Sequence, residues 1–217
     1  MSEGIRVVFD LDGTLIDSAP DICAVAGAVL EAEGRAPLSL AETRDFVGSG
    51  AGAFVARMRA ARDLPEDREP RLLEAFLARY EGAVDHTVLY DGVMSALGEL
   101  VQAGHRLGLC TNKPIAPTRA VLRHFGMASI FTAVVGGDSL SARKPDPAPL
   151  RAALERMGGG ATLYVGDSEI DARTAAAAGV PFILRRGGYA HLPAEEMGAA
   201  AAFDDFADLP GIVARMA

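Results

Sequence analysis

The sequence predicts an α/β fold, a doubly wound parallel sheet with helices on both faces and an all-helical unit inserted after the first strand. Two patterns in the 217 residues support this prediction. Short apolar runs of strand length alternate with segments of helical length, which is typical of parallel sheets. Residues 18–84 interrupt this alternation, because they show helical periodicity and no convincing strand.

The predicted strands are apolar at consecutive positions, as expected for strands that are covered on both faces. They span residues 5–10 (IRVVFD), 105–112 (HRLGLCTN), 131–137 (FTAVVGG), 161–167 (ATLYVGD) and 180–186 (VPFILRR). After the helical insertion, we expect the sheet to resume near Val88.

Segments with helical length and periodicity lie between these strands. They span residues 91–104, 114–126, 146–160 and 168–179. Asp91 and Ser168 are predicted N-caps, since short polar side chains accept hydrogen bonds from the first free amides of a helix. Glycines at 104, 126, 158 and 179 stand where these helices are expected to end. The rhythm of strand and helix predicts a core of residues 1–17 and 85–217.

The insertion, residues 18–84, contains four helical patterns. They span residues 19–34, 40–47, 51–63 and 69–82. Because the insertion follows the first strand, it is expected to lie over the carboxyl end of that strand. Ligands bind at this edge in open α/β sheets.

Composition excludes several classes of partner. The formal net charge of −8 argues against a nucleic-acid or anionic-membrane surface, since either would need basic patches. Cys23 and Cys110 are too few and too far apart for a disulfide framework or a zinc site. No apolar run has the length of a membrane span, and no signal-peptide pattern is present. We therefore expect a reduced, cytoplasmic protein. The sequence leaves open whether it is a monomer or a homodimer.

Four polar groups follow predicted strands. They are Asp10 with Asp12, Thr111-Asn112-Lys113, Lys144, and Asp167 with Asp171. Because the carboxyl ends of parallel strands meet in one crevice, these side chains are expected to lie close together. Carboxylates gathered there would repel one another, so a hard cation is implied. A few mixed oxygen ligands beside a phosphate site suit Mg²⁺.

This set of residues predicts phosphoryl chemistry on a small phosphorylated metabolite. The Asp10 carboxylate could attack phosphorus and form an aspartyl phosphate, which divides one difficult displacement into two easier ones. Asp12 could protonate the leaving oxygen and then deprotonate water. Thr111 and the adjacent amide could hold phosphoryl oxygens, while Lys144 neutralises charge.

These segments also have other interpretations, which the sequence favours less. Asp12 or Asp167 could be only a helix cap or turn former. A calcium loop beginning at Asp10 would need Gly and Glu where Leu15 and Asp21 stand. The segment GSGAGA (48–53) matches a dinucleotide fingerprint weakly, without a preceding strand. A non-enzymatic phospho-receiver also carries a strand-end Asp with Thr and Lys, but it needs no base two residues away.

With these motifs in view, the chain resembles phosphatases of the haloacid dehalogenase superfamily. The segments DLDGTLIDS, CTNKP, RKPDPAPL and VGDSEIDARTAAAAG match its four motifs in order and spacing, and the insertion is similar to its C1-type helical cap. The segments VGSGA, TNKP, GGDS and GDSEID are most similar to phosphoglycolate phosphatases. The resemblance implies a Rossmann-like core and hydrolysis of 2-phosphoglycolate to glycolate and phosphate. Alternatives are a phosphosugar phosphatase, a pyrophosphatase or a phosphosugar mutase.

The resemblance also implies residue roles. Asp10 would be the nucleophile and Asp12 the general acid and base. Thr111 and Asn112 would contact the phosphate, and Lys144 would be the stabilising cation. Mg²⁺ would be held by Asp10, the Asp12 backbone carbonyl and Asp167, with Asp171 in support.

A glycine-rich loop in the insertion is a candidate for binding the other end of the substrate. Gly48, Ser49 and Gly50 precede a predicted helix, and helix N-termini offer free amides to anions. We expect this loop, with Arg44, to close over the non-phosphate end. Asp17 and Ser18 are expected in the hinge. The segment LRRGGYAH departs from the family pattern by its two arginines.

Overall fold

The computed structural model describes residues 4–217, so the first three residues of the predicted core lie outside the described part. A six-stranded sheet forms the centre of the core, in the order β5-β4-β1-β6-β7-β8, and every neighbouring pair is parallel. Its strands are β1 (Arg6–Phe9), β4 (Arg106–Cys110), β5 (Phe131–Val135), β6 (Thr162–Gly166), β7 (Phe182–Arg185) and β8 (Ala201–Phe203). The predicted fold class is confirmed.

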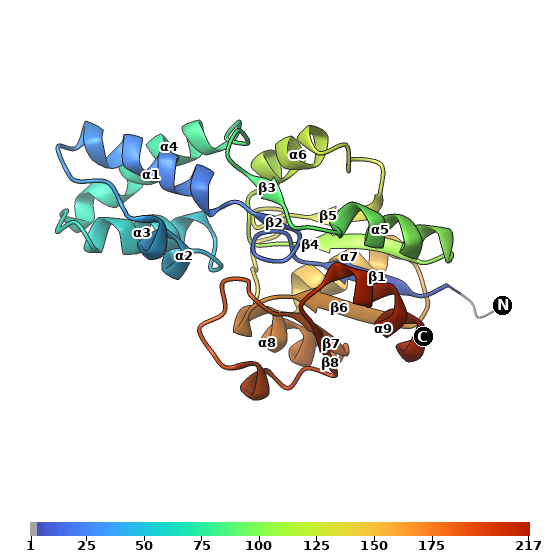
Figure 1. Ribbon diagram of the computed structural model, residues 1–217. Helices are drawn as coiled ribbons and strands as arrows, with labels where there is room; N and C mark the ends of the chain where they lie inside the picture. The colour runs from blue at the N-terminus through green and yellow to red at the C-terminus, as the bar shows by residue number, and fades with distance from the viewer. Residues whose placement is uncertain (1–3) are drawn as a thin grey trace.

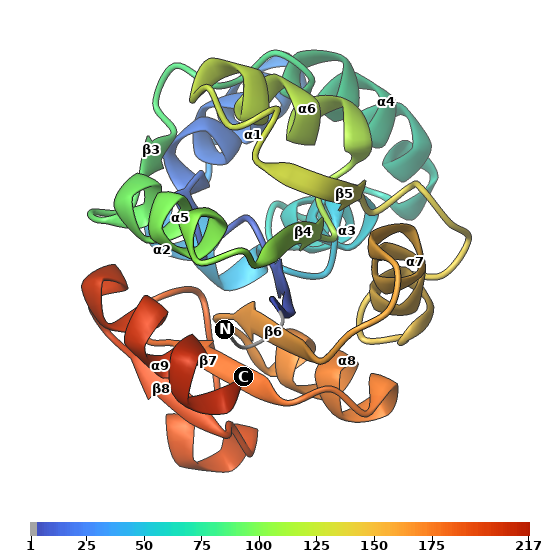
Figure 2. The same ribbon diagram turned by 90° about the vertical axis from the view of Figure 1, so that its right-hand side faces the viewer.

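Helices cover both faces of this sheet. They are α5 (Val93–Gln102), α6 (Ile115–His124), α7 (Ala148–Met157), α8 (Glu169–Ala178) and α9 (Leu209–Met216). In Figure 2, α7 and α8 lie on one side of the strands, whereas α5 and α9 lie on the other. Successive side chains of β1 point to opposite faces of the sheet. Val7 and Phe9 pack with α5, α6 and α9, while Val8 packs with α7 and α8. This explains why the strands are apolar at every position.

Four helices form a separate unit between β1 and β4. They are α1 (Ala19–Ala32), α2 (Leu40–Phe46), α3 (Ala51–Ala60) and α4 (Glu69–Tyr80). Figure 1 shows them together beside the sheet, at the end where the loop after β1 leaves it. They share a hydrophobic core that includes Phe54, Phe76 and Tyr80. All four helices lie within residues 18–84, the range for which the sequence predicts an inserted helical unit.

A short antiparallel pair connects the two parts. Strands β2 (Ile16–Asp17) and β3 (Val88–Leu89) carry the chain into and out of the helical unit (Figure 1). The prediction that the main sheet resumes near Val88 is therefore wrong, because β3 pairs only with β2 and the sheet resumes at β4. Two strands with this pairing hold the ends of the insertion together.

Two further details differ from the predictions. Helix α5 begins after Gly92, whose φ of 79° places it in the left-handed region, so Asp91 is not its N-cap. Strand β8 was not predicted, because it is only three residues long and its Ala-Ala start carries no strand pattern. Helix α9, which follows it near the end of the chain, was not predicted either. Ser168 is confirmed as an N-cap and forms a capping box with Asp171. Within residues 4–217, no helix is long and apolar enough to cross a membrane.

Candidate active site

Three carboxylates gather at the carboxyl edge of the sheet. Asp10 directly follows β1 and Asp167 directly follows β6, and these two strands are paired neighbours. Asp171 lies in the first turn of α8. One carboxylate oxygen from each of the three lies within 4.8 Å of the others, and all three residues are buried. The structure therefore brings together acids that are about 160 residues apart in the sequence.

The cluster is strongly perturbed by burial. Desolvation, opposed by Lys144 and reinforced by the charges of Asp171 and Asp12, raises the pKa of Asp10 to about 7. Desolvation, together with Asp171 and Asp10, raises the pKa of Asp167 well above its ordinary value. Without a neutralising positive charge, these buried carboxyl groups therefore favour their protonated forms. A cation placed among them would restore the ionised forms.

The donor set fits a small hard cation such as Mg²⁺. Oδ1 of Asp10 is buried and makes no hydrogen bond, although it lies at ion-pair distance, 2.9 Å, from Nζ of Lys144. Asp167 accepts one hydrogen bond on each oxygen, from Thr14 Oγ1 and from the amide of Tyr189, both at 2.7 Å. Each carboxylate oxygen has a second lone pair for a metal. Asp10 and Asp167 can therefore offer oxygen ligands to one ion.

Asp171 is engaged differently. Its Oδ1 accepts hydrogen bonds from Lys144 Nζ at 2.7 Å and Tyr164 Oη at 2.9 Å. Its Oδ2 accepts from the amides of Asp167 and Ser168 and from the Ser168 hydroxyl. With both oxygens occupied and no exposure, Asp171 supports the cluster more readily than it binds a metal. Its support of a bound metal, which the family resemblance implies, stays a prediction.

Two glycines let the chain close around Asp167. A Cβ on Gly13 or on Gly188 would lie 2.3 Å from Oδ2 of Asp167, a distance that side chains do not adopt. Gly13 also has a φ of +83°, in the left-handed region. Gly13 belongs to the first predicted motif, whereas Gly188 belongs to the segment that departs from the family pattern. Both positions are therefore part of the site.

Lys144 is a buried cation between two acids. Its Nζ lies 2.9 Å from Asp10 Oδ1 and 2.7 Å from Asp171 Oδ1, and its side chain is 2% exposed. Burial alone would lower the pKa of Lys144, but the charges of Asp10 and Asp171 outweigh it and raise the pKa. Lys144 therefore stays charged beside Asp10.

Asp12 faces the space between the core and the helical unit. Its Oδ1 accepts hydrogen bonds from Ser18 Oγ at 2.6 Å and from Lys113 Nζ at 3.0 Å. Its side chain is not part of the three-carboxylate cluster. Because the Asp12 side chain lies outside this cluster, it suits proton exchange with a substrate better than binding of the metal. The role of its backbone carbonyl as a metal ligand stays a prediction.

Thr111 and Asn112 follow β4 at the same edge. Both are buried and line the cavity described below. Asn112 also connects loops: its Nδ2 donates to the carbonyls of Gly48 and Lys144, and its Oδ1 accepts from the amide of Lys144, all at 3.0 Å. The Asn112 side chain therefore fixes the glycine-rich loop and the Lys144 loop in place. Its predicted contact with phosphate stays a prediction.

A cavity of about 430 Å³, including its opening, lies between the core and the helical unit. Asp10, Asp12 and residues 111–114 line it from the core. The helical unit contributes Ile22, Val47, Gly48, Gly50, Ala51, Phe54, Phe76 and Tyr80. One wall is therefore polar and charged, and the other is mostly apolar. A ligand in this cavity would contact both parts of the chain.

The glycine-rich loop meets this cavity through two of its three predicted residues. Gly48 and Gly50 line it, whereas Ser49 lines a neighbouring groove. Helix α3 begins at Ala51, and its N-cap Gly50 supplies no side-chain hydrogen bond. The first turn of α3 therefore borders the cavity and has no side-chain cap. Arg44 does not line the cavity and instead pairs with Asp17 at 2.7 Å, so its predicted part in this loop is not supported.

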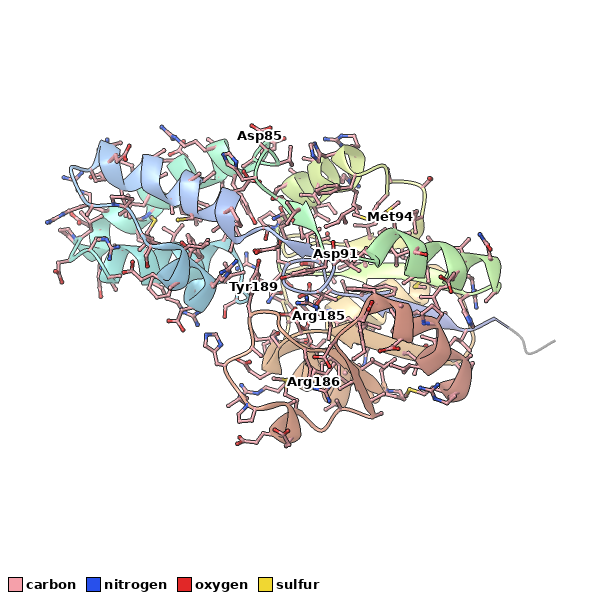
Figure 3. The ribbon with its side chains drawn as sticks, in the orientation of Figure 1. Asp85, Asp91, Met94, Arg185, Arg186 and Tyr189 are labelled. Atoms are coloured by element: carbon pink, nitrogen blue, oxygen red, sulfur yellow. The ribbon has the colours of Figure 1, made fainter. Side chains whose placement is uncertain are left out.

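Two site residues, Arg185 and Tyr189, were missed in the sequence, and Lys113 was placed in a strand-end polar group without a role of its own. Arg185 donates to the carbonyl of Gly13 at 3.1 Å. The hydroxyl of Tyr189 donates to Asp17 and accepts from the amide of Ser18, at the entry to the helical unit. Figure 3 shows Tyr189 and Arg185 beside the loop after β1. The two arginines in LRRGGYAH were the sequence feature that could have indicated this contact. A single sequence does not show which of the two side chains points into the site.

His191 bridges the two parts of the chain. Its Nε2 lies 3.1 Å from Oδ1 of Asp45, at the end of α2, and its Nδ1 lies 3.1 Å from Oε1 of Glu169, at the start of α8. Burial lowers the pKa of His191, but hydrogen bonds to Glu169 and Asp45 outweigh it and raise the pKa above its ordinary value. Protonated His191 therefore stabilises the contact between the helical unit and the core.

Replacing His191 with Gln tests this contact. The pKa of His191 is higher in the folded protein than in the unfolded one. Protonated His191 therefore stabilises the folded state at pH values below its unfolded pKa, and this stabilisation is lost as the pH rises through its folded pKa. The side chain is 42% exposed, so the effect is small. We expect His191→Gln to lower Tm by about 1–3 °C near pH 6 and not at all near pH 9. Thermal unfolding at both pH values measures this, and a deficit that persists near pH 9 contradicts the ionic bridge.

Comparisons with known proteins agree with this geometry. A family model described as haloacid dehalogenase-like hydrolase matches residues 7–185. A phosphoglycolate phosphatase of Cereibacter sphaeroides is 46% identical over 213 residues, covering 97% of this chain and 98% of the relative. One of Rhodospirillum rubrum is 45% identical, covering 94% and 88%. A crystal structure described as a predicted phosphoglycolate phosphatase from Haemophilus somnus superimposes with a TM-score of 0.89 and 30% identity, covering 98% and 99%.

Proposed function

This chain belongs to the haloacid dehalogenase-like hydrolase family, and from that premise we propose that it hydrolyses 2-phosphoglycolate to glycolate and phosphate in a Mg²⁺-dependent reaction. The observation that carries the proposal is the position of Asp10. Its carboxylate is buried beside Lys144 and the other acids, yet it also lines the cavity that a substrate would enter.

In the first step, a carboxylate oxygen of Asp10 attacks phosphorus and the bond from phosphorus to the ester oxygen breaks. The leaving alkoxide takes a proton from Asp12, whose carboxyl group borders the same cavity. The product is an aspartyl phosphate on Asp10 and free glycolate. Lys144 offsets the charge that the transferring phosphoryl group brings to Asp10.

In the second step, Asp12 takes a proton from water, and the water oxygen attacks phosphorus. The bond between phosphorus and Asp10 breaks, which releases phosphate and regenerates both carboxyl groups in their initial protonation states. Thr111 and Asn112 are proposed to contact the phosphoryl oxygens, because both are buried at the cavity wall. Mg²⁺, held by Asp10 and Asp167, would neutralise phosphoryl charge.

The helical unit, residues 18–84, is proposed to act as a cap. Its apolar residues Val47, Phe54 and Phe76 would exclude water from the reacting groups. Asp17 and Ser18 are proposed to form the hinge, because they join β2 to α1 and both contact Tyr189. The loop of Gly48 and Gly50 is proposed to bind the non-phosphate end at the start of α3.

Relatives that are 45–46% identical over nearly the whole chain support 2-phosphoglycolate as the substrate, since they are phosphoglycolate phosphatases. A phosphosugar phosphatase is the second candidate. A structure of a CbbY variant from Rhodobacter sphaeroides in complex with xylulose-1,5-bisphosphate superimposes with a TM-score of 0.80 at 25% identity. The apolar cap wall favours the smaller substrate, because sugar hydroxyls would find few partners among Ile22, Val47, Phe54 and Phe76.

The experiment is a comparison of kcat/KM across about twenty phosphate monoesters in Mg²⁺, with release of inorganic phosphate as the readout. We expect 2-phosphoglycolate to exceed phosphosugars by at least about 10-fold, because unsatisfied hydroxyl groups would cost them binding energy. A phosphosugar with the highest kcat/KM would favour the second candidate. Phosphate transfer back to substrate, without release, would instead indicate a mutase.

A further inference from the structure

We propose that Lys113 recognises the carboxylate of the substrate and so sets the preference for acidic phosphate esters, an inference that rests on the proposed function. Lys113 lies between α6 and the end of β4, in the cavity wall. Its side chain is 1% exposed. Among the described residues that line the cavity, it is the only cation, since Lys144 lies deeper, between Asp10 and Asp171.

The two lysines of this chain have different contacts. Lys144 is occupied by two carboxylates that belong to the reaction centre. Lys113 contacts one acid of the core, Asp12, at 3.0 Å, and one residue of the cap, the hydroxyl of Tyr80, at 2.5 Å. It is thus placed where the core and the helical unit meet around the cavity.

Lys113 has capacity for another partner. An ammonium group has three N–H donors, and Asp12 and Tyr80 account for two of them among the described residues. Nζ also lies 4.4 Å from the centre of the Tyr80 ring. Tyr80 accepts the hydrogen bond from Lys113, so its own hydroxyl proton can be donated elsewhere. Burial raises the pKa of Tyr80 well above its ordinary value, which keeps that proton in place.

The charges around the cavity favour a cation near the tail of the substrate. A phosphate ester with a carboxylate tail brings a second anion into a space that already holds Asp10 and Asp12. The remaining cap wall, including Phe54 and Phe76, offers that tail no charge. An anion buried there without a cation would be strongly disfavoured. The first amides of α3 contribute partial charge, and Lys113 contributes the full one.

The test compares two substrates that differ only in the tail: 2-phosphoglycolate, which carries a carboxylate, and 2-hydroxyethyl phosphate, which is neutral there. For Lys113→Met, we expect the ratio of their kcat/KM values to fall by about 10- to 100-fold, mainly because the acidic substrate binds more weakly and its KM rises. Lys113→Arg should retain most of the preference, because it retains the charge.

Arg143 provides the matched comparison. It is an exposed cation beside the glycine-rich loop, since a Cβ on Gly50 would lie 3.8 Å from its Cδ, but it does not line the cavity. We expect Arg143→Met to leave the ratio unchanged. A ratio that falls in Arg143→Met and not in Lys113→Met would overturn the assignment.

A merely structural role of Lys113 predicts a different result. If it only positions Asp12, both substrates lose kcat equally and their ratio stays at the wild-type value, which would refute carboxylate recognition. Should Lys113→Met fail to fold, Lys113→Gln, which keeps a donor for Asp12 but no charge, gives the same two outcomes. If the wild-type protein does not hydrolyse 2-phosphoglycolate at all, the proposed function itself is wrong.

Discussion

Replacing Asp10 with Asn is expected to lower kcat for 2-phosphoglycolate by at least about four orders of magnitude, since the amide cannot form an acyl phosphate. Asn has nearly the same shape as Asp and keeps the position after β1. Release of inorganic phosphate in Mg²⁺ measures the loss. Near-normal turnover in Asp10→Asn would rule out the covalent scheme.

The fold of Asp10→Asn needs a separate measurement. The substitution removes a partner of Lys144, and breaking one side of a buried ion pair costs about 3–5 kcal/mol. It also removes the repulsion that Asp10 exerts on Asp167, so the net loss should be smaller. Circular dichroism and thermal unfolding verify that the variant is folded. Asp204→Asn, at a side chain that is 75% exposed, is the matched control and should retain the wild-type rate.

Replacing Asp12 with Asn is expected to lower kcat for 2-phosphoglycolate by about 10²- to 10⁴-fold, the usual contribution of a general acid and base. The loss should depend on the leaving group. Glycolate needs a proton as it departs, whereas p-nitrophenolate is stable without one. With p-nitrophenyl phosphate, we therefore expect a rapid burst of one p-nitrophenol per protein, followed by slow turnover.

The burst separates the two tasks of Asp12. Phosphorylation of Asp10 proceeds without an acid when the leaving group is good, but hydrolysis of the aspartyl phosphate still lacks its base. Stopped-flow absorbance measures both phases, with Asp204→Asn again as the control. If Asp12→Asn turned over 2-phosphoglycolate at the wild-type rate, Asp12 would have no part in proton transfer.

The positions of the main acids could be predicted from the sequence because they depend on topology. Each follows a buried strand or begins a helix, and parallel strands bring their carboxyl ends to one edge whatever lies between them. Asp10 and Asp167 therefore meet although their separation in the chain is large. The inserted helices were recognisable for a similar reason, since their apolar periodicity differs from that of the strands.

The supporting residues could not be predicted, because their roles depend on which way a side chain turns in the folded protein. Lys113 stands beside Thr111 and Asn112, but nothing local indicates that its ammonium group meets Tyr80 of the cap. Tyr189 belongs to an irregular segment with no periodic pattern, and its hydroxyl lies 2.7 Å from Asp17. Strand β8 was missed because three residues carry too little pattern.

The most direct measurement of the central claim is reduction of the protein by borohydride during turnover of 2-phosphoglycolate in Mg²⁺, followed by peptide mass spectrometry. Borohydride reduces an acyl phosphate to an alcohol, so a phosphorylated aspartate is converted to homoserine. We predict homoserine at position 10, dependent on substrate and missing from Asp10→Asn. Homoserine at another aspartate, or continued phosphate release with residue 10 unmodified, would contradict the account.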